Sequence, residues 1–168
     1  VLNATNGFAI IGKEKIKIKA DRFIYEKKLS TIKALGNVEI NDLKNDITIK
    51  SEEAFYQKKK GLIKSDVKST FLDSAGNNII TDKFSYTLDD DLIKIFNAKI
   101  VTIENDTLHI KKAYVNLLTN KLIGKDVSIN FNNKNFKKDN EPRLKGKTIT
   151  HEEGKSIIKK GIFTTCKK

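Results

Sequence analysis

The chain is 168 residues long, enough for one domain with a hydrophobic core, and we interpret residues 1–168 as a single domain. Its 33 basic and 21 acidic residues give a net charge of +12, which favours anionic partners such as nucleic acid or a membrane surface. We expect no nucleic-acid partner, because only Arg22 and Arg143 are arginine and the lysines are spread along the chain. No apolar run approaches the roughly 20 residues of a membrane-spanning helix.

Two series of isoleucines return about every thirty residues. The first series opens one set of equivalent segments at Ile18, Ile49, Ile80 and Ile110. The second series opens another set at Ile32, Ile63, Ile93 and Ile123. A fixed period of this size predicts one supersecondary unit stacked on copies of itself, an architecture that builds elongated surfaces more often than catalytic pockets.

Within each unit, apolar residues alternate with polar ones at a period of two, and β-branched and aromatic residues are frequent. Short polar turns separate these segments, so neighbouring strands must be antiparallel. No segment has a helical pattern. We therefore predict an all-β fold of about ten strands, at residues 16–25, 32–40, 47–56, 63–71, 79–86, 93–103, 108–117, 123–131, 144–150 and 157–164, preceded by a shorter strand at 8–11.

The alternation breaks in the first strand of three units, next to a charged pair: Asp21-Arg22, Glu52-Glu53 and Asp82-Lys83. Ala20 and Phe23 fall on opposite faces if the strand is regular. A β-bulge or a bend at the charged pair would turn both side chains inward and would also curve the sheet. The sequence does not place the bulge within each strand.

Residues suited to catalysis or metal binding are few. His109 and His151 lie about forty residues apart, without the spacing of a metal site, and His109 has the pattern of a solvent-facing strand residue. Asp89–Asp91 lacks the spaced oxygens of a calcium loop, so we interpret it as a solvated turn. Nucleophile and phosphate-loop motifs are also absent from the sequence. We therefore expect no enzymatic activity, no metal and no cofactor.

The only cysteine is Cys166, the third residue from the end of the sequence. A lone cysteine is often a small buried hydrophobic residue. The neighbouring threonines and lysines make a poor setting for burial, and an unpaired cysteine in an exported protein suggests a bond to a partner. The residues alone leave both interpretations open.

The first repeat resembles a known unit, the OstA-like repeat of periplasmic lipopolysaccharide-transport proteins. In that family an ADxxxY segment leads into an AxGNV strand, and the chain matches with Ala20-Asp21 and Tyr25, then with Ala34, Gly36-Asn37 and Val38. The resemblance covers most of residues 16–131. The ending Gly161–Cys166 is similar to the segment that joins the N-terminal periplasmic domain of the LptD family to its outer-membrane barrel.

The resemblance implies a β-jellyroll of two antiparallel sheets that enclose a V-shaped, open groove. The acyl chains of lipopolysaccharide would lie against the apolar inner face of this groove. The residues that we expect to line it are Ile18, Ala20, Phe23, Tyr25, Ile32, Val38, Ile40, Ile49, Phe55, Ile63, Val67, Ile80, Phe84, Tyr86, Ile93, Ile95, Val101, Ile110, Ile123, Val127 and Ile129.

The resemblance also implies a function and partners. The chain would be a non-enzymatic conduit that passes lipopolysaccharide toward an outer-membrane barrel, in the periplasm and attached to the outer membrane through that barrel. Cys166 would form a disulfide with a cysteine outside this chain. The implied partners are the LptD barrel, the LptE lipoprotein and an LptA-like bridge jellyroll that adds to an edge strand.

Two alternatives remain from the sequence. The chain could instead be an LptA-like bridge subunit, which shares the repeat but not the ending at Cys166. It could also be a closed β-solenoid or sandwich with a dry core, acting as a structural module or binding polyanions on its basic outer face. An open or a closed apolar interior separates these hypotheses.

Overall fold

Antiparallel pairing accounts for every strand in the computed structural model, which describes residues 1–12, 15–132 and 141–165. Within these ranges the strands form one hydrogen-bonded sheet, and no α-helix occurs. The strands are β1 (Leu2–Ile11), β2 (Ile16–Glu26), β3 (Thr31–Asp42), β4 (Ile47–Gln57), β5 (Leu62–Ser65), β6 (Ser69–Leu72), β7 (Asn78–Thr81), β8 (Lys83–Thr87), β9 (Leu92–Val101), β10 (Thr107–Asn116), β11 (Lys121–Asn130), β12 (Arg143–Glu152), β13 (Lys155–Lys159) and β14 (Ile162–Thr164).

The all-β prediction is confirmed, and most predicted strands match within two residues. The first strand is longer than predicted, because β1 begins at Leu2 and pairs along β2. Three predicted strands, at 63–71, 79–86 and 157–164, are each divided into two. One 3₁₀ turn, Lys58–Lys60, follows β4 and ends at Gly61 in the left-handed conformation.

The long strands are interrupted near their midpoints, where the ladder skips or shifts. The register shifts between Lys19 and Arg22 in β2 and between Leu35 and Val38 in β3, as the predicted bulge requires. Asn37 has a positive φ there, and its side-chain amide donates a hydrogen bond of 2.9 Å to Asp21. A β-bulge of this kind changes which face of the sheet the following side chains point to.

The same arrangement recurs in later strands. Asn97 in β9 has a φ of 50° and donates a 3.0 Å hydrogen bond to Asp82, next to the start of β8. Asp126 in β11 has a φ of 54° and accepts a 2.7 Å hydrogen bond from Lys147 in β12. The break in alternation that the sequence shows is therefore a repeated bulge with a polar cross-strand bond.

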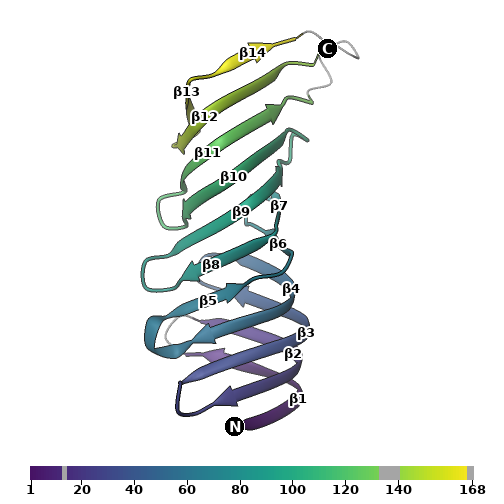
Figure 1. The fold of residues 1–168 in the computed structure, drawn as a ribbon, viewed down its shortest axis with the longest axis vertical. Coiled ribbons are helices and arrows are strands. Elements are labelled where there is room, and N and C mark those ends of the chain that lie inside the picture. The colour runs from purple at the N-terminus through teal and green to yellow at the C-terminus, as the bar shows by residue number, and fades with distance from the viewer. Residues whose placement is uncertain (13–14, 133–140, 166–168) are drawn as a thin grey trace.

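The bulges divide the sheet into two layers. One layer contains the halves that pair with β5 and β8, and the other contains the halves that pair with β6 and β7, because β4 and β9 each pair with both sets. In Figure 1 the purple and blue N-terminal strands fold back behind themselves, while β9 to β12 follow one above the other along the long axis. β1 and β14 lie at opposite ends of that axis.

Apolar side chains on the inner sides of the two layers form the core, and small residues line the bend between the layers. Ser51, Ser65 and Ser69 are buried there, and the Ser51 hydroxyl forms hydrogen bonds with Ser65 at 3.1 Å and with Ser69 at 3.0 Å. At Gly124, an added Cβ would lie 2.9 Å from a methyl carbon of Ile110. The two layers approach so closely at the bend that larger side chains do not fit.

Candidate functional site

The apolar interior between the layers is the candidate site, and its inner face is continuous across the sheet. Inner residues of neighbouring strands lie opposite one another in the ladder. One row of such residues runs from Ile18 through Ile49 to Ile129. Of the predicted groove residues, those on the inner face are Ile18, Ala20, Phe23, Tyr25, Ile32, Val38, Ile40, Ile49, Ile63, Phe84, Tyr86, Ile93, Ile95, Ile110, Val127 and Ile129.

Four predicted groove residues lie on the outer face instead. They pair with outer-face residues or contact a lysine: Phe55 lies under Lys64, and Ile80, Val101 and Ile123 pair with Lys99, Thr107 and Tyr114. Their error has one physical cause, because the alternation was carried unchanged across each bulge. In β11, for example, Gly124 and Val127 both face inward, so the phase of Val127 does not extend back to Ile123.

The remaining predicted residue, Val67, lies in the bend between β5 and β6 and is half-buried. Sequence reasoning also missed inner residues that lie on the other side of a bulge or next to it. Restarting the alternation after each Asp, Asn or Glu at a break would have found most of them. The buried ones are Ile16, Ile47, Ala54, Tyr56, Leu88, Ala98, Ile100, Ala113 and Ile149.

The middle of the interior is packed by the chain's own side chains. Phe71 from one layer meets Phe84 from the other edge to face, with ring centroids 5.0 Å apart. Ile49 and Ile63, also from opposite layers, are both fully buried at 0% exposure. The apolar face is therefore shielded from solvent in this segment, and an acyl chain would have to displace these contacts.

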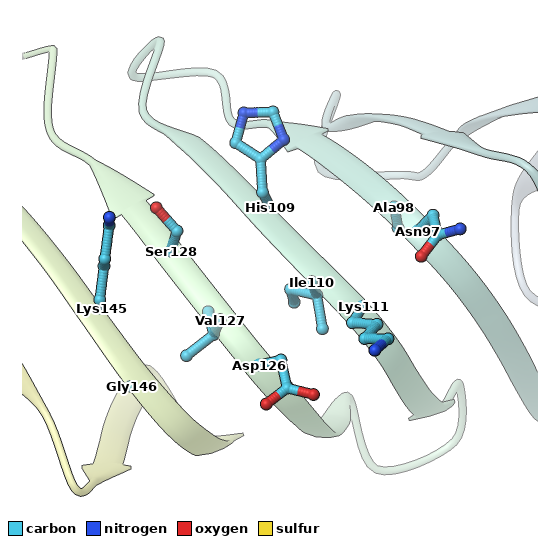
Figure 2. Close-up of a pocket in the computed structure, with 10 residues that line it drawn as sticks. All are labelled: Asn97, Ala98, His109, Ile110, Lys111, Asp126, Val127, Ser128, Lys145 and Gly146. Carbon is cyan, nitrogen blue, oxygen red and sulfur yellow. The ribbon is translucent and has the colours of Figure 1, made fainter.

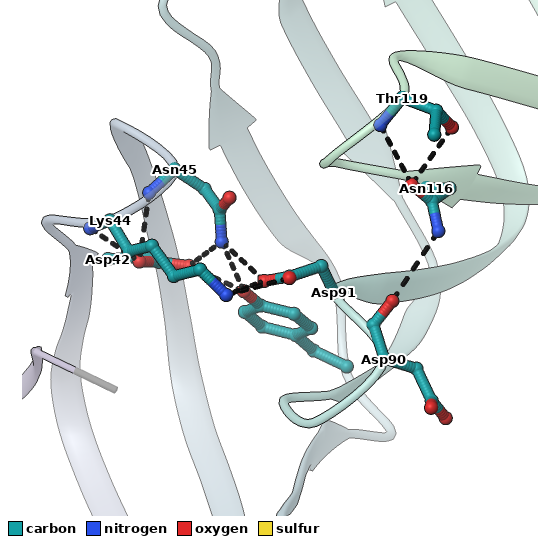
Figure 3. Close-up of polar contacts among 8 residues, drawn as sticks. Asp42, Lys44, Asn45, Asp90, Asp91, Asn116 and Thr119 are labelled. Carbon is teal, nitrogen blue, oxygen red and sulfur yellow. Dashed lines mark hydrogen bonds and ion pairs between the residues drawn. The ribbon is translucent and has the colours of Figure 1, made fainter. Parts of the chain in front are cut away.

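A polar cluster joins the free rims of the two layers beside this packed segment (Figure 3). Lys44 and Asn45, in the turn after β3, reach Asp91 in the turn after β8. The Lys44 Nζ lies 2.7 Å from a carboxylate oxygen of Asp91, and the Asn45 amide donates to the same carboxylate at 2.9 Å. Tyr86 donates to Asp42, which also accepts from Asn45. We call these five residues the rim clasp.

The rim clasp shifts the pKa values of two of its groups, Asp91 and Tyr86. Burial raises the pKa of the Asp91 carboxyl, but hydrogen bonds from Lys44 and Asn45 outweigh it and hold the pKa below its ordinary value. Burial, followed by the hydrogen bond to Asp42, raises the pKa of Tyr86 far above its ordinary value. Asp91 is only 6% exposed, so the interpretation of Asp89–Asp91 as a solvated turn is wrong for its third residue.

The inner face is uncovered toward both ends of the molecule. Leu2 in β1 pairs with Tyr25 on the inner face and is 66% exposed. Phe163 in β14 pairs with Leu144 on the inner face and is 61% exposed. Other inner side chains of the C-terminal half are only partly buried, namely Leu108, Leu117, Leu122, Phe131, Leu144 and Ile158. Apolar surface is thus available at the ends and shielded in the middle.

A shallow depression of about 500 Å³ lies over β9 to β12 (Figure 2). Its polar lining comes from His109, Ser128 and Lys145, which are cross-strand neighbours, and from Asn97, Lys111 and Asp126 at the bulge. His109 is exposed, as predicted. The depression has no group of His, Cys, Asp or Glu that could hold a metal, and neither does the rest of the described chain.

Two further observations concern membranes and the cysteine. In the described ranges, no helix has the length and apolar character that crossing a membrane requires. Cys166 lies outside the described residues, so its predicted disulfide stays a prediction.

Comparison with known proteins defines the class of fold. No family model matches the sequence, and no curated protein matches it significantly. The structure is similar to that of LptH from Pseudomonas aeruginosa, with a TM-score of 0.54 and 13% identity over 62% of this chain and 78% of that chain. LptH is described as the LptA-homologous periplasmic component of the lipopolysaccharide transport device. The chain is therefore an all-β protein with the β-jellyroll fold of LptH.

Proposed function

We propose that the chain is a non-enzymatic lipid conduit whose interior takes up the acyl chains of lipopolysaccharide in the periplasm. The observation that carries this proposal is the continuous apolar inner face, exposed at Leu2 and Phe163 at its two ends. The fold shared with LptH, a component of a lipopolysaccharide transport device, supports the same reading.

The chemistry of the interior suits an acyl chain and little else. Each methylene that leaves water for the interior contributes about 0.8 kcal/mol, so a long chain binds without a specific pocket. The phosphates and sugars of the lipid would stay outside, because every buried side-chain polar atom of the described residues already has a partner. Because the middle of the interior is packed, an acyl chain would enter at an exposed end. The two layers would then part to admit it further.

Within this function, we propose that residues 1–168 are one domain of an LptD-like protein. The ending Gly161–Cys166 is the sequence feature behind this assignment. Cys166 would then form a disulfide with a cysteine outside the chain, and the domain would pass lipid to an outer-membrane barrel associated with LptE. Lipopolysaccharide would reach it from an LptA-like jellyroll that pairs with the free edge of a terminal strand.

The second candidate is an LptA-like bridge subunit, which the likeness to LptH favours. Non-reducing electrophoresis of the full-length protein separates the two, with and without a Cys166→Ser substitution. An LptD-like protein shows a disulfide-dependent shift that the substitution removes. A free thiol at Cys166 would favour the bridge subunit and leave the conduit function intact.

The conduit function itself is tested with two neighbouring positions at the exposed C-terminal end. Phe163 faces inward and Ile162 faces outward, and both are highly exposed, at 61% and 71%. A photo-crosslinking amino acid at Phe163 should capture lipopolysaccharide, whereas the same group at Ile162 should not. Equal capture from both positions would contradict the conduit. No capture from either, with a folded protein, would favour a closed structural module.

A further inference from the structure

The positive charge of this protein is concentrated in its C-terminal half. Residues 1–91 carry 16 basic and 14 acidic residues, whereas residues 92–168 carry 17 basic and 7 acidic residues. The net charge of +12 therefore divides into +2 and +10. The lysines are spread along the whole chain. The acidic residues that balance their charge lie mostly in the N-terminal half.

Cross-strand pairing gathers this charge on the outer face of β9 to β13. One row follows the pairs Phe96–Lys112, Lys112–Lys125, Lys125–Thr148 and Thr148–Lys159. A second row, on the other side of the bulge, contains Lys99, His109, Ser128 and Lys145. The depression of Figure 2 lies along this second row, so the groups that line it are mostly cationic or neutral.

The carboxylates on this face are already engaged. Asp126 binds Lys147 at 2.7 Å, and Glu152 binds Lys121 at 2.9 Å. Hydrogen bonding to Lys147 holds the pKa of Asp126 below its ordinary value. The other described acidic residues of this half lie at the ends of strands or in the turns between them. The face therefore presents an excess of cations that an anionic partner can complement.

The N-terminal half provides an internal contrast. On its outer face, lysines meet carboxylates in neighbouring strands or in an adjacent bend: Lys33 with Glu53, Lys50 with Glu39, and Lys64 with Asp66 just after β5. A partner that recognises charge should therefore discriminate between the two halves of the same sheet.

Exposed apolar side chains lie among the cations. Tyr114 pairs with Ile123, Ile123 with Thr150, and Thr150 with Ile157, and the three apolar members are 37%, 49% and 52% exposed. Lys94 and Lys112 lie 5.6 and 5.2 Å from the ring centre of Tyr114. Aromatic and aliphatic groups surrounded by lysines suit the headgroup region of a bilayer, where rings and methyl groups enter and ammonium groups meet phosphate.

We infer that the outer face of β9 to β13 binds the surface of an anionic membrane. The inference is independent of the proposed conduit, because it concerns the face opposite to the apolar interior. A membrane fits better than nucleic acid, since this half of the chain has a single arginine and exposes isoleucines that phosphate-backbone binding does not use. A membrane bound to this outer face would leave the interior and the rim clasp unobstructed.

The test is sedimentation of the full chain with vesicles that contain no lipopolysaccharide. We expect binding to vesicles of 70% phosphatidylcholine and 30% phosphatidylglycerol, little binding to pure phosphatidylcholine, and loss of binding at high salt. Replacing Lys94, Lys112 and Lys125 by glutamine should weaken binding at least tenfold. A second variant, Ile123→Ser with Ile157→Ser, should weaken it without changing the charge.

The matched control removes three lysines from the N-terminal half, with Lys33, Lys50 and Lys64 replaced by glutamine. It loses the same charge and should keep most of the binding. Equal loss in both triple variants, with melting curves like that of the unchanged protein, would show that net charge alone acts and would overturn the inference. So would tighter binding to a DNA duplex than to the anionic vesicles at the same salt concentration.

Discussion

At the scale of single residues, the position of Gly36 explains why the first repeat carries glycine before asparagine. Its φ of +74° lies in the left-handed region, and a Cβ there would come 2.5 Å from an Asp21 carboxylate oxygen. The same Asp21 accepts the hydrogen bond from Asn37. Backbone conformation and the cross-strand bond thus depend on the absence of a side chain at position 36.

We predict that Gly36→Ala lowers the free energy of unfolding by about 2–4 kcal/mol, since strain in the left-handed region adds to a steric clash. Chemical denaturation followed by circular dichroism measures it. Gly154→Ala is the matched control, because Gly154 has a φ of +73° but nothing within 4 Å of an added Cβ. The Gly154→Ala substitution should lower the free energy of unfolding by only about 1 kcal/mol. Equal losses would mean that the contact with Asp21 contributes nothing.

At the scale of strands, the bulge decides which side chains face inward. The sequence correctly predicted that Ala20 and Phe23 are both turned inward, because a charged pair separates them and the alternation visibly breaks. It failed at Ile80, Val101 and Ile123, where an apolar residue happens to stand on the outer face. Alternation of apolar and polar residues shows which side chains face inward only within the half of a strand on one side of the bulge.

The positions Val127 and Ile123 test this phase change. Val127 is 3% exposed and Ile123 is 49% exposed, although an uninterrupted strand would place both on one face. We predict that Val127→Asp lowers stability by about 3–5 kcal/mol, since it buries a carboxylate without a partner, while Ile123→Asp changes it by less than about 1 kcal/mol. Thermal melting of both variants measures the contrast. Similar destabilisation by both would contradict a bulge at Asp126.

Strand positions were predictable because turns and periodicity are local. The division of 63–71 and 79–86 was not, because it depends on β4 and β9 each pairing with two partners. The same holds for the interior. Apolar residues mark an inner face, but whether two faces close on each other depends on contacts such as that between Phe71 and Phe84.

At the scale of the whole molecule, the rim clasp is a feature that the sequence could not predict. Asp42, Lys44 and Asn45 are more than forty residues from Asp91 and Tyr86. Only the folding of the sheet into two layers brings them together. Because the clasp joins the rims of the two layers, we expect it to resist the opening of the packed middle that the proposed conduit function requires.

We predict that Lys44→Met loosens the clasp. Asp91 keeps Asn45 but loses its cationic partner, and since Lys44 is half exposed the loss of stability should be about 1–2 kcal/mol. If the clasp resists opening by that amount, the rate of uptake of cis-parinaric acid, followed by fluorescence, should rise up to about tenfold. Lys50→Met, which removes a longer surface ion pair with Glu39, is the control and should change neither quantity appreciably.

Acid should reproduce the effect of Lys44→Met in the unchanged protein. The pKa of Asp91 is lower in the folded chain than its ordinary value of 3.8, so the stabilisation is present above that value and is lost as pH falls through the folded pKa. The stability difference between the unchanged protein and Lys44→Met should therefore be constant from pH 7 to about pH 5 and shrink below about pH 4. A difference that persists undiminished at pH 2 would show that Lys44 acts through packing of its aliphatic stem, and the clasp would then not be electrostatic.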